Sequence, residues 1–154
     1  QEVGVSNKTL SNYLFYLEES FLLRKIYNFS RNLITSEKKL KKFYLASPSF
    51  SWALADFVET GRLAENLVVS LKNYQFFWRD VYKHEVDFVE IDNNKIVPIE
   101  VKYRNEIPAH ELKNLSFFAK RFDVKKGLVL TKTFTEKSRE VNGIEIAEKG
   151  IWAI

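Results

Sequence analysis

The sequence predicts an α/β fold of the α+β type: a helix, a three-strand meander, a second helix and one more strand, preceded by a further helix and a two-stranded ribbon. Residues 61–73 and 110–122 repeat apolar side chains at helical spacing. Between them lie three apolar-rich segments separated by polar turn residues, which is typical of antiparallel strands. With 154 residues, 45% of them hydrophobic, the chain is long enough to bury a substantial core.

The first helix is expected to begin after Ser6, a residue type favoured at N-caps. Four large apolar side chains then recur at helical spacing and predict an amphipathic stripe: Leu10, Leu14, Leu17 and Phe21. Two strands follow, over residues 22–29 and 41–47, and a polar segment joins them. A helix followed by a ribbon with a basic loop is the pattern of a winged helix, so residues 1–47 are predicted to form a partial winged-helix module.

A winged-helix module suggests where DNA would bind. The start of its recognition helix would meet DNA, and the wing would contribute lysines. The expected contacts are Lys8, Ser11 and Asn12 on the helix and Lys38, Lys39, Lys41 and Lys42 on the wing. In a second interpretation, the module packs between domains and touches no DNA.

Pro48 marks the predicted domain boundary, because proline disfavours helix at the residue before it and suits the first turn of a following helix. We therefore assign residues 48–154 to a second domain. It starts with helices near residues 50–59 and 61–73. In the latter, a stripe of three leucines is expected to be buried, with Glu65 beside it, near the strands: Leu63, Leu67 and Leu71.

The segment from His84 to Lys102 predicts a hairpin that carries charges. Asn93 and Asn94 can form a two-residue turn, because asparagine tolerates positive φ. That turn places Asp87 opposite Glu100, and like charges in this position destabilise a ladder. The same register places Glu85 opposite Lys102 and predicts an ion pair between them.

The facing acids allow two interpretations. Mg²⁺ accepts one or two carboxylates together with waters and phosphate oxygens, so Asp87 and Glu100 could bind it. Lys102, about 6.7 Å further along the same face by strand rise, could then stabilise charge that develops on an attacked phosphate. Alternatively, the three side chains form a partly exposed ion-pair cluster.

The remaining elements complete the predicted core. A helix over residues 110–122 is expected to bury one face: Leu112, Leu115, Phe118 and Phe122. Residues 127–131 read as an interior strand and residues 142–148 as a further one, while the type of the last segment is left open. Trp78 is expected in the core, with Arg79 either gripping DNA or pairing with a nearby carboxylate.

These motifs together resemble the PD-(D/E)XK nuclease superfamily, which has the restriction-endonuclease-like core. Residues 61–73, 76–80, 84–91 and 97–104 are also similar to the C-terminal region of a family of archaeal and bacterial P-loop ATPases, in which a winged-helix segment precedes a nuclease-like domain. The resemblance implies that Asp87, Glu100 and Glu65 are metal ligands and that Lys102 and Glu65 are catalytic. One position departs from the nominal pattern, because Val86 stands where the superfamily has proline before the aspartate.

Two functions follow from the resemblance. The first is a DNA-cleaving module that depends on Mg²⁺ or Mn²⁺, and the second is a non-cleaving DNA-binding or protein-interaction domain that regulates an attached ATPase. The five glycines form no P-loop, so ATP is not expected to bind here and the ATPase domain would lie elsewhere in the full-length chain.

Composition narrows the class of protein further. The chain has no cysteine, which excludes disulfides and thiolate metal sites. It has no methionine either, so we interpret it as part of a longer protein. No signal peptide or membrane span is apparent, and we expect a cytoplasmic protein without a membrane partner. The net charge of +4 is mild, so the clustering of lysines is more informative than their sum.

Overall fold

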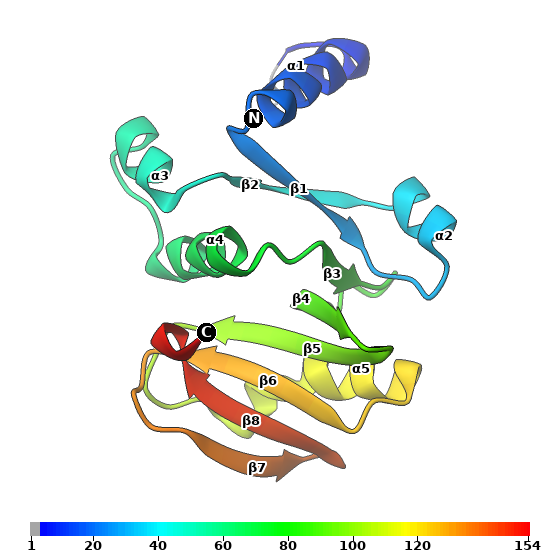
Figure 1. Ribbon diagram of the computed structural model, residues 1–154, viewed down its shortest axis with the longest axis vertical. Helices are drawn as coiled ribbons and strands as arrows, with labels where there is room; N and C mark the ends of the chain where they lie inside the picture. The colour runs from blue at the N-terminus through cyan, green and yellow to red at the C-terminus, as the bar shows by residue number, and fades with distance from the viewer. Residues whose placement is uncertain (1–3) are drawn as a thin grey trace.

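One mixed sheet of eight strands organises the structure, a computed structural model that describes residues 4–154 (Figure 1). The strands lie in the order β2-β1-β3-β4-β5-β6-β8-β7. Their bounds are β1 (Leu23–Asn28), β2 (Lys41–Leu45), β3 (Phe76–Arg79), β4 (Glu85–Asp92), β5 (Lys95–Lys102), β6 (Lys126–Thr131), β7 (Lys137–Val141) and β8 (Ile144–Gly150). The helices are α1 (Asn7–Glu19), α2 (Leu33–Lys38), α3 (Pro48–Leu54), α4 (Thr60–Lys72) and α5 (Lys113–Phe122), with short 3₁₀ turns η1 (Ala109–Leu112) and η2 (Ile151–Ala153).

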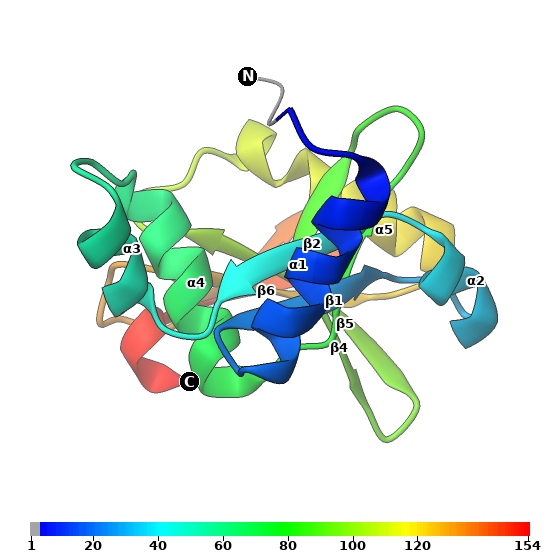
Figure 2. The same cartoon turned by 90° about the horizontal axis from the view of Figure 1, so that it is seen from above.

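The predicted order of helix, meander, helix and strand is confirmed by α4, β3 to β5, α5 and β6. β4 pairs antiparallel with both β3 and β5, and β6 joins β5 in parallel after the α5 connection. Phe88 packs in a core that includes residues of α4, whereas its neighbour Val89 packs in the core that includes residues of α5. The two helices therefore cover opposite faces of the sheet, and Figure 2 shows the strands between them.

The buried face of α5 follows the sequence closely. Leu112, the last residue of η1, and Leu115 and Phe118 of α5 are fully buried, and Phe122 is packed against the same core. Trp78 also lies in this core, as predicted, with its ring edge-on to Phe118. Helical spacing alone was enough to predict the buried face of α5, because its opposite face is mostly polar. Only one orientation of the helix buries the large apolar side chains.

The predicted leucine stripe of α4 is only partly right, because Leu67 is half-buried and packs against the core and Leu63 is half-buried, but neither is fully buried. Leu71 is exposed, and the buried apolar side chains of this helix are instead Ala64, Val68 and Val69. Both sets are apolar, so hydrophobicity alone could not choose between them. Polar anchors fix the rotation: the Asn66 amide donates to the Leu45 carbonyl at 2.7 Å, and the Ser70 hydroxyl donates to the Ala46 carbonyl at 3.2 Å.

The N-terminal helix and ribbon form as elements, with Ser6 accepting from the Thr9 N–H at the start of α1. β1 and β2 pair antiparallel, and β1 also pairs in parallel with β3 through Tyr27 and Phe76. The ribbon is thus continuous with the central sheet. α1 packs against β1 and has no buried residue within the described chain, so its apolar stripe remains largely exposed.

The far edge of the sheet contains a strand that the sequence did not predict. β7 pairs antiparallel with β8, and its sequence, KSREV, is mostly charged or polar. Charged edge strands are common because they discourage pairing with another chain. Across residues 4–154, no helix combines the length and the apolar character that crossing a bilayer requires.

Candidate functional site

The β4/β5 hairpin forms as the sequence predicted. Asn93 and Asn94 have φ values of 48° and 63°, as a type I′ turn requires. The ladder runs from Asp92 opposite Lys95 to Phe88 opposite Ile99. Asp87 and Glu100 are the next residues along this register, just beyond the last pair of the ladder.

The pairing of β4 with β3 shifts register next to Asp87. Phe76 of β3 pairs with Val89, but Trp78 pairs with Val86, so β4 has one extra residue in this interval. A bulge interrupts the alternation of side chains and can redirect one of them. The carboxylate of Asp87 accepts the Val101 N–H at 2.8 Å.

Asp87 and Glu100 are both buried, at 9% and 4% exposed. Burial raises the pKa of Asp87, although the Val101 N–H and the charges of Lys42 and Lys102 oppose the rise. Burial and then the charge of Asp87 raise the pKa of Glu100 to about 8. Glu100 Oε1 accepts from Lys102 Nζ at 2.7 Å, but Oε2 is buried with no hydrogen-bond partner among the described residues.

Glu65 of α4 completes a group of three carboxylates whose charges affect one another. Burial, followed by the charge of Asp87, raises the pKa of Glu65 to about 7, and Glu65 in turn raises that of Glu100. The Tyr44 hydroxyl of β2 donates to Glu65 Oε2 at 3.2 Å. We call Glu65, Asp87, Glu100 and Lys102 the carboxylate site.

Basic side chains lie within this site and next to it. Burial alone would lower the pKa of Lys102, but the charge of Glu100 and the hydrogen bond to it raise it overall. Lys42 Nζ contacts Glu85 at 2.5 Å, and Arg79 Nε lies 3.5 Å from the same carboxylate. The predicted Glu85–Lys102 ion pair is therefore wrong. Lys42 of β2 pairs with Glu85, and Lys102 pairs with Glu100 instead. The register of the hairpin could not reveal this, because β2 is not part of the hairpin.

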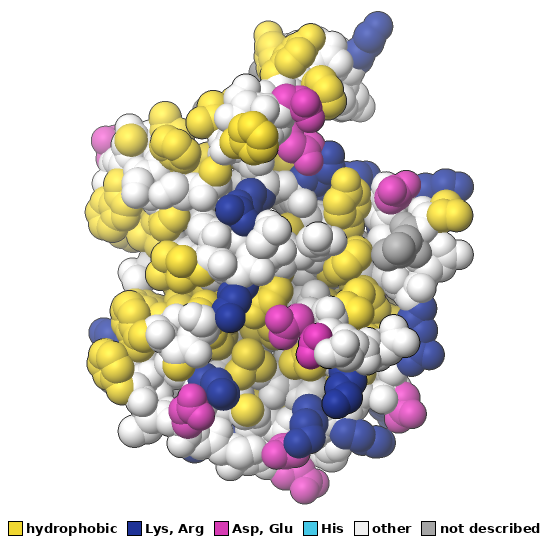
Figure 3. Space-filling model, in the orientation of Figure 1, with side chains coloured by type: hydrophobic (Ala, Val, Ile, Leu, Met, Phe, Trp, Pro, Cys, Tyr) yellow, Lys and Arg dark blue, Asp and Glu magenta, His cyan; other side chains and the backbone are white. Residues whose placement is uncertain are grey.

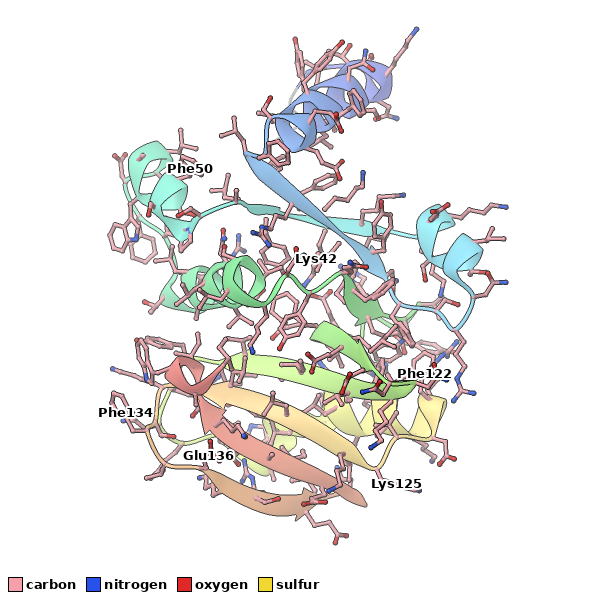
Figure 4. All side chains as sticks on the ribbon, viewed as in Figure 1. Lys42, Phe50, Phe122, Lys125, Phe134 and Glu136 are labelled. Carbon is pink, nitrogen blue, oxygen red and sulfur yellow. The ribbon has the colours of Figure 1, made fainter. Side chains whose placement is uncertain are left out.

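A cavity of about 700 Å³ opens beside Glu65, between β2, α3 and α4. Lys42, Tyr44 and Glu85 line its polar side, and apolar residues such as Leu54 and Phe57 line the other. Figure 4 shows Lys42 pointing from β2 into the space above α4 and the start of β4. Glu65 is itself one of the residues that line this cavity.

The residues fit a divalent cation through a pair of ligands. Within residues 4–154, no three His, Asp or Glu side chains are grouped so as to hold a metal by themselves. Mg²⁺, however, uses one or two carboxylates and completes its shell with water and phosphate. The unpartnered oxygen of Glu100 and its closeness to Asp87 are what such an ion would relieve. Glu65 as a direct ligand stays a prediction.

The predicted DNA-contacting residues do not form one group. Lys8, Ser11 and Asn12 are exposed on α1, which Figure 1 places beyond the β1/β2 ribbon and apart from the carboxylate site. Lys38 and Lys39 are exposed near the end of α2. Lys41 donates to the Glu37 carbonyl at 2.7 Å, whereas Lys42 and Arg79 face Glu85. Contact with DNA stays a prediction for all of them.

Sequence reasoning missed Tyr44 as a site residue. Tyr44 and Lys42 are two positions apart on β2, so alternation places them on one face. That signal was present, but nothing local showed that β1 and β2 would extend the sheet beside β3 and so bring this face to Glu65.

Comparison with known protein families identifies the family to which this α/β domain belongs. A family model described as a domain of unknown function, DUF4143, matches residues 60–148, which is more than half of the chain, and the chain therefore belongs to this family. The match includes Glu65, Asp87, Glu100 and Lys102. A second model, described as a domain of unknown function, DUF8612, matches residues 1–60 and includes Lys42 and Tyr44. No curated protein and no solved structure matches the chain.

Proposed function

We propose that residues 48–154 form a PD-(D/E)XK nuclease-like domain that hydrolyses phosphodiester bonds in DNA with the help of Mg²⁺ or Mn²⁺. The order of α4, the β3 to β5 meander, α5 and β6 supports a restriction-endonuclease-like core. Asp87 and Glu100 would hold the ion, and Lys102 would lie beside the phosphate.

The observation that carries this proposal is that Glu100 is buried with one carboxylate oxygen unpartnered. A carboxylate that is 4% exposed, next to a second buried acid and with one oxygen unpartnered, is costly unless a cation or a proton compensates it. Lys102 compensates only one of its oxygens. A structural ion pair would need no second acid at this position.

Each residue of the site has a defined task in this proposal. A bound divalent ion would neutralise the scissile phosphate and lower the pKa of a water. Lys102 would direct its ammonium at the charge that develops on the phosphate. Glu65, with a pKa raised to about 7, can accept or release a proton near neutral pH. Tyr44 would hold the carboxyl of Glu65 in place.

The test is DNA cleavage with Mn²⁺ by the protein and by variants that preserve shape. Plasmid, branched and single-stranded DNA would each be incubated with the wild-type protein, Asp87→Asn, Glu100→Gln and Lys102→Met. We expect cleavage by the wild type and at least a 100-fold loss in each variant. Asp92→Asn, an exposed acid at the turn of the same hairpin, is the matched control and should cleave normally. No cleavage by the wild type, or equal cleavage by all variants, would reject the proposal.

A non-catalytic role is the second candidate. It is favoured by the pairing of Lys42 and Lys102 with carboxylates, which leaves neither ammonium unpaired at the site. Titration of duplex DNA at several salt concentrations separates the alternatives within this role. A steep loss of affinity with salt indicates phosphate contacts, whereas the absence of DNA binding favours a protein partner.

We also propose that this domain acts within a larger protein that contains an ATPase. DUF4143 domains are often found in proteins associated with AAA ATPases. In this proposal α1 and the β1/β2 ribbon act as the partial winged-helix module, with Lys8, Ser11 and Asn12 toward DNA. Charge-reversal of Lys8 to glutamate should then weaken duplex binding without changing the unfolding temperature; unchanged binding would exclude α1 from the interface.

A further inference from the structure

Three aromatic side chains gather at the edge of the sheet where β5 and β6 end. Phe134 stacks on Trp152, with ring centroids 5.9 Å apart and an interplanar angle of 17°. Tyr103 meets the edge of Trp152 at 6.1 Å. Phe134 is 86% exposed and Trp152 is 52% exposed, so two stacked rings stand at the surface. We call Tyr103, Phe134 and Trp152 the aromatic shelf.

The shelf rests on a firmly packed loop. The Thr133 carbonyl lies so close to Gly150 that a Cβ at this glycine would be only 2.3 Å from its oxygen. The Thr133 N–H and hydroxyl contact the Thr131 hydroxyl at 3.2 and 2.9 Å. Lys149 and Glu136 form an ion pair at 3.5 Å across the same loop. The loop therefore holds Phe134 over Trp152, although neither ring is needed to fill the core.

The shelf is linked to the carboxylate site along the chain at the end of β5. Tyr103 directly follows Lys102, the residue that pairs with Glu100. Tyr103 packs against the same core as α4, the helix that carries Glu65. Figure 4 shows Phe134 at the edge toward which β5 and β6 point, and Figure 3 shows hydrophobic side chains exposed there. The shelf therefore lies at the end of the strand that carries Glu100 and Lys102.

A cation without a counter-charge accompanies the rings. Lys132 is exposed, and its Nζ lies 5.8 Å from the centre of the Tyr103 ring. Among residues 4–154, Lys132 makes no ion pair. Exposed rings for stacking next to an ammonium for phosphate are the two components of a single-stranded nucleic-acid site.

We propose that the aromatic shelf and Lys132 bind unpaired nucleotides of DNA and lead a single strand to the carboxylate site. This inference rests on the proposed function for the identity of the polymer. The interior of a duplex does not fit the shelf, because its bases stack on one another and offer no free face, whereas an unpaired base can stack on Phe134. The substrate class is therefore DNA with a single-stranded or unpaired segment.

Binding is tested separately from cleavage, by fluorescence anisotropy of a labelled oligothymidylate in EDTA. Stacking on an aromatic side chain makes a base contact strong enough that its loss should weaken binding by roughly 5- to 100-fold in Phe134→Ala and in Trp152→Ala. Trp152→Phe should retain most of the affinity, because it preserves the stack. Phe117→Ala is the matched control: Phe117 is a partly exposed aromatic on α5, the helix on the other face of the sheet, and its loss should leave binding unchanged.

Salt dependence distinguishes the lysine from the rings. Lys132→Gln should reduce the slope of log affinity against log salt by about 0.7, the value for one phosphate contact on a single strand. The aromatic variants should lower affinity without changing this slope. A blunt duplex of the same length should bind equally to the wild type and to Phe134→Ala. Unfolding curves of each variant would show that the fold is kept.

The possible outcomes separate this inference from the proposed function. Shelf-dependent binding in EDTA without any cleavage in Mn²⁺ supports the shelf and rejects the nuclease. Cleavage that requires Asp87 but is equal on single-stranded and duplex DNA, and equal in Phe134→Ala, supports the nuclease and overturns the shelf. No binding of the oligothymidylate, or equal binding by all the shelf variants, also overturns it.

Discussion

Replacing Glu100 with glutamine tests the electrostatics of the carboxylate site without removing side-chain volume. The folded-state pKa of Glu100 is about 8, against an ordinary value of 4.5. Between these two pH values the folded chain holds a proton that the unfolded chain has released. The free energy of unfolding therefore falls as pH rises through this window. Glutamine cannot ionise, so the variant should lose no stability for this reason.

The expected size of the effect follows from the shift in pKa. A difference of about 3.5 units corresponds to about 5 kcal/mol at 1.36 kcal/mol per unit. Asp87 and Glu65 titrate with Glu100 and share the cost, so we expect a difference of about 2–4 kcal/mol between the variant and the wild type at pH 8.5. At pH 4.5 the difference should be below about 1 kcal/mol, because both side chains are then largely neutral. Urea unfolding at a series of pH values measures it.

Adding Mg²⁺ provides the second half of this experiment. If the ion binds only the folded chain, it should stabilise the wild type by about 2.7 kcal/mol at a concentration 100 times its Kd. The glutamine variant should gain much less. A difference in stability that is constant from pH 4.5 to 8.5 would refute the electrostatic reasoning, and equal stabilisation of both proteins by Mg²⁺ would refute Glu100 as a ligand.

Three further changes have expected outcomes. Tyr44→Phe removes a hydrogen bond that lowers the pKa of Glu65, so that pKa should rise above its value of about 7 in a carboxyl NMR titration; a fall would contradict the assignment. Glu148→Ala removes a carboxylate that is 1% exposed and lies against two cations. Urea unfolding should show a loss of stability of about 2 kcal/mol. This is less than the roughly 3–5 kcal/mol usual for breaking a buried ion pair, because both cations keep some contact with water. Gly150→Ala should lower stability by about 1–3 kcal/mol, because the new Cβ collides with the Thr133 carbonyl. The same variant should bind oligothymidylate more weakly. Binding as tight as that of the wild type would show that the loop is not what holds the rings.

The parts of the site that the sequence predicted are those that local rules determine. The pairing of β4 with β5 follows from a two-residue asparagine turn and a side-chain period of two, and these leave one register that buries Ile99 and Val101. The core face of α5 follows from helical spacing. Both depend on residues that are near one another in the chain.

The parts that could not be predicted depend on distant residues. The bulge at Asp87 arises from the pairing of β4 with β3, and the sequence of β4 contains no glycine or proline that would mark it. Tyr44 reaches Glu65 only because β1 pairs in parallel with β3, across about fifty residues of chain. β7 has too few apolar residues to be recognised as a strand, because its edge position requires only Val141 to be buried.

The charges around the site support a cation and a phosphate together better than either alone. The group consists of four carboxylates and three cations: Glu65, Asp87, Glu85 and Glu100 with Lys42, Arg79 and Lys102. With every group ionised, one negative charge remains in a region where Asp87 and Glu100 are almost excluded from water. A divalent ion would reverse this charge to one positive, and a single phosphodiester would then bring it to zero. Buried charge is least costly when it is fully paired, so the site should bind the ion more tightly when DNA is present. Measuring the Kd of Mn²⁺ with and without oligothymidylate checks this, and an unchanged or weaker Kd would show that the excess charge is neutralised by protons instead.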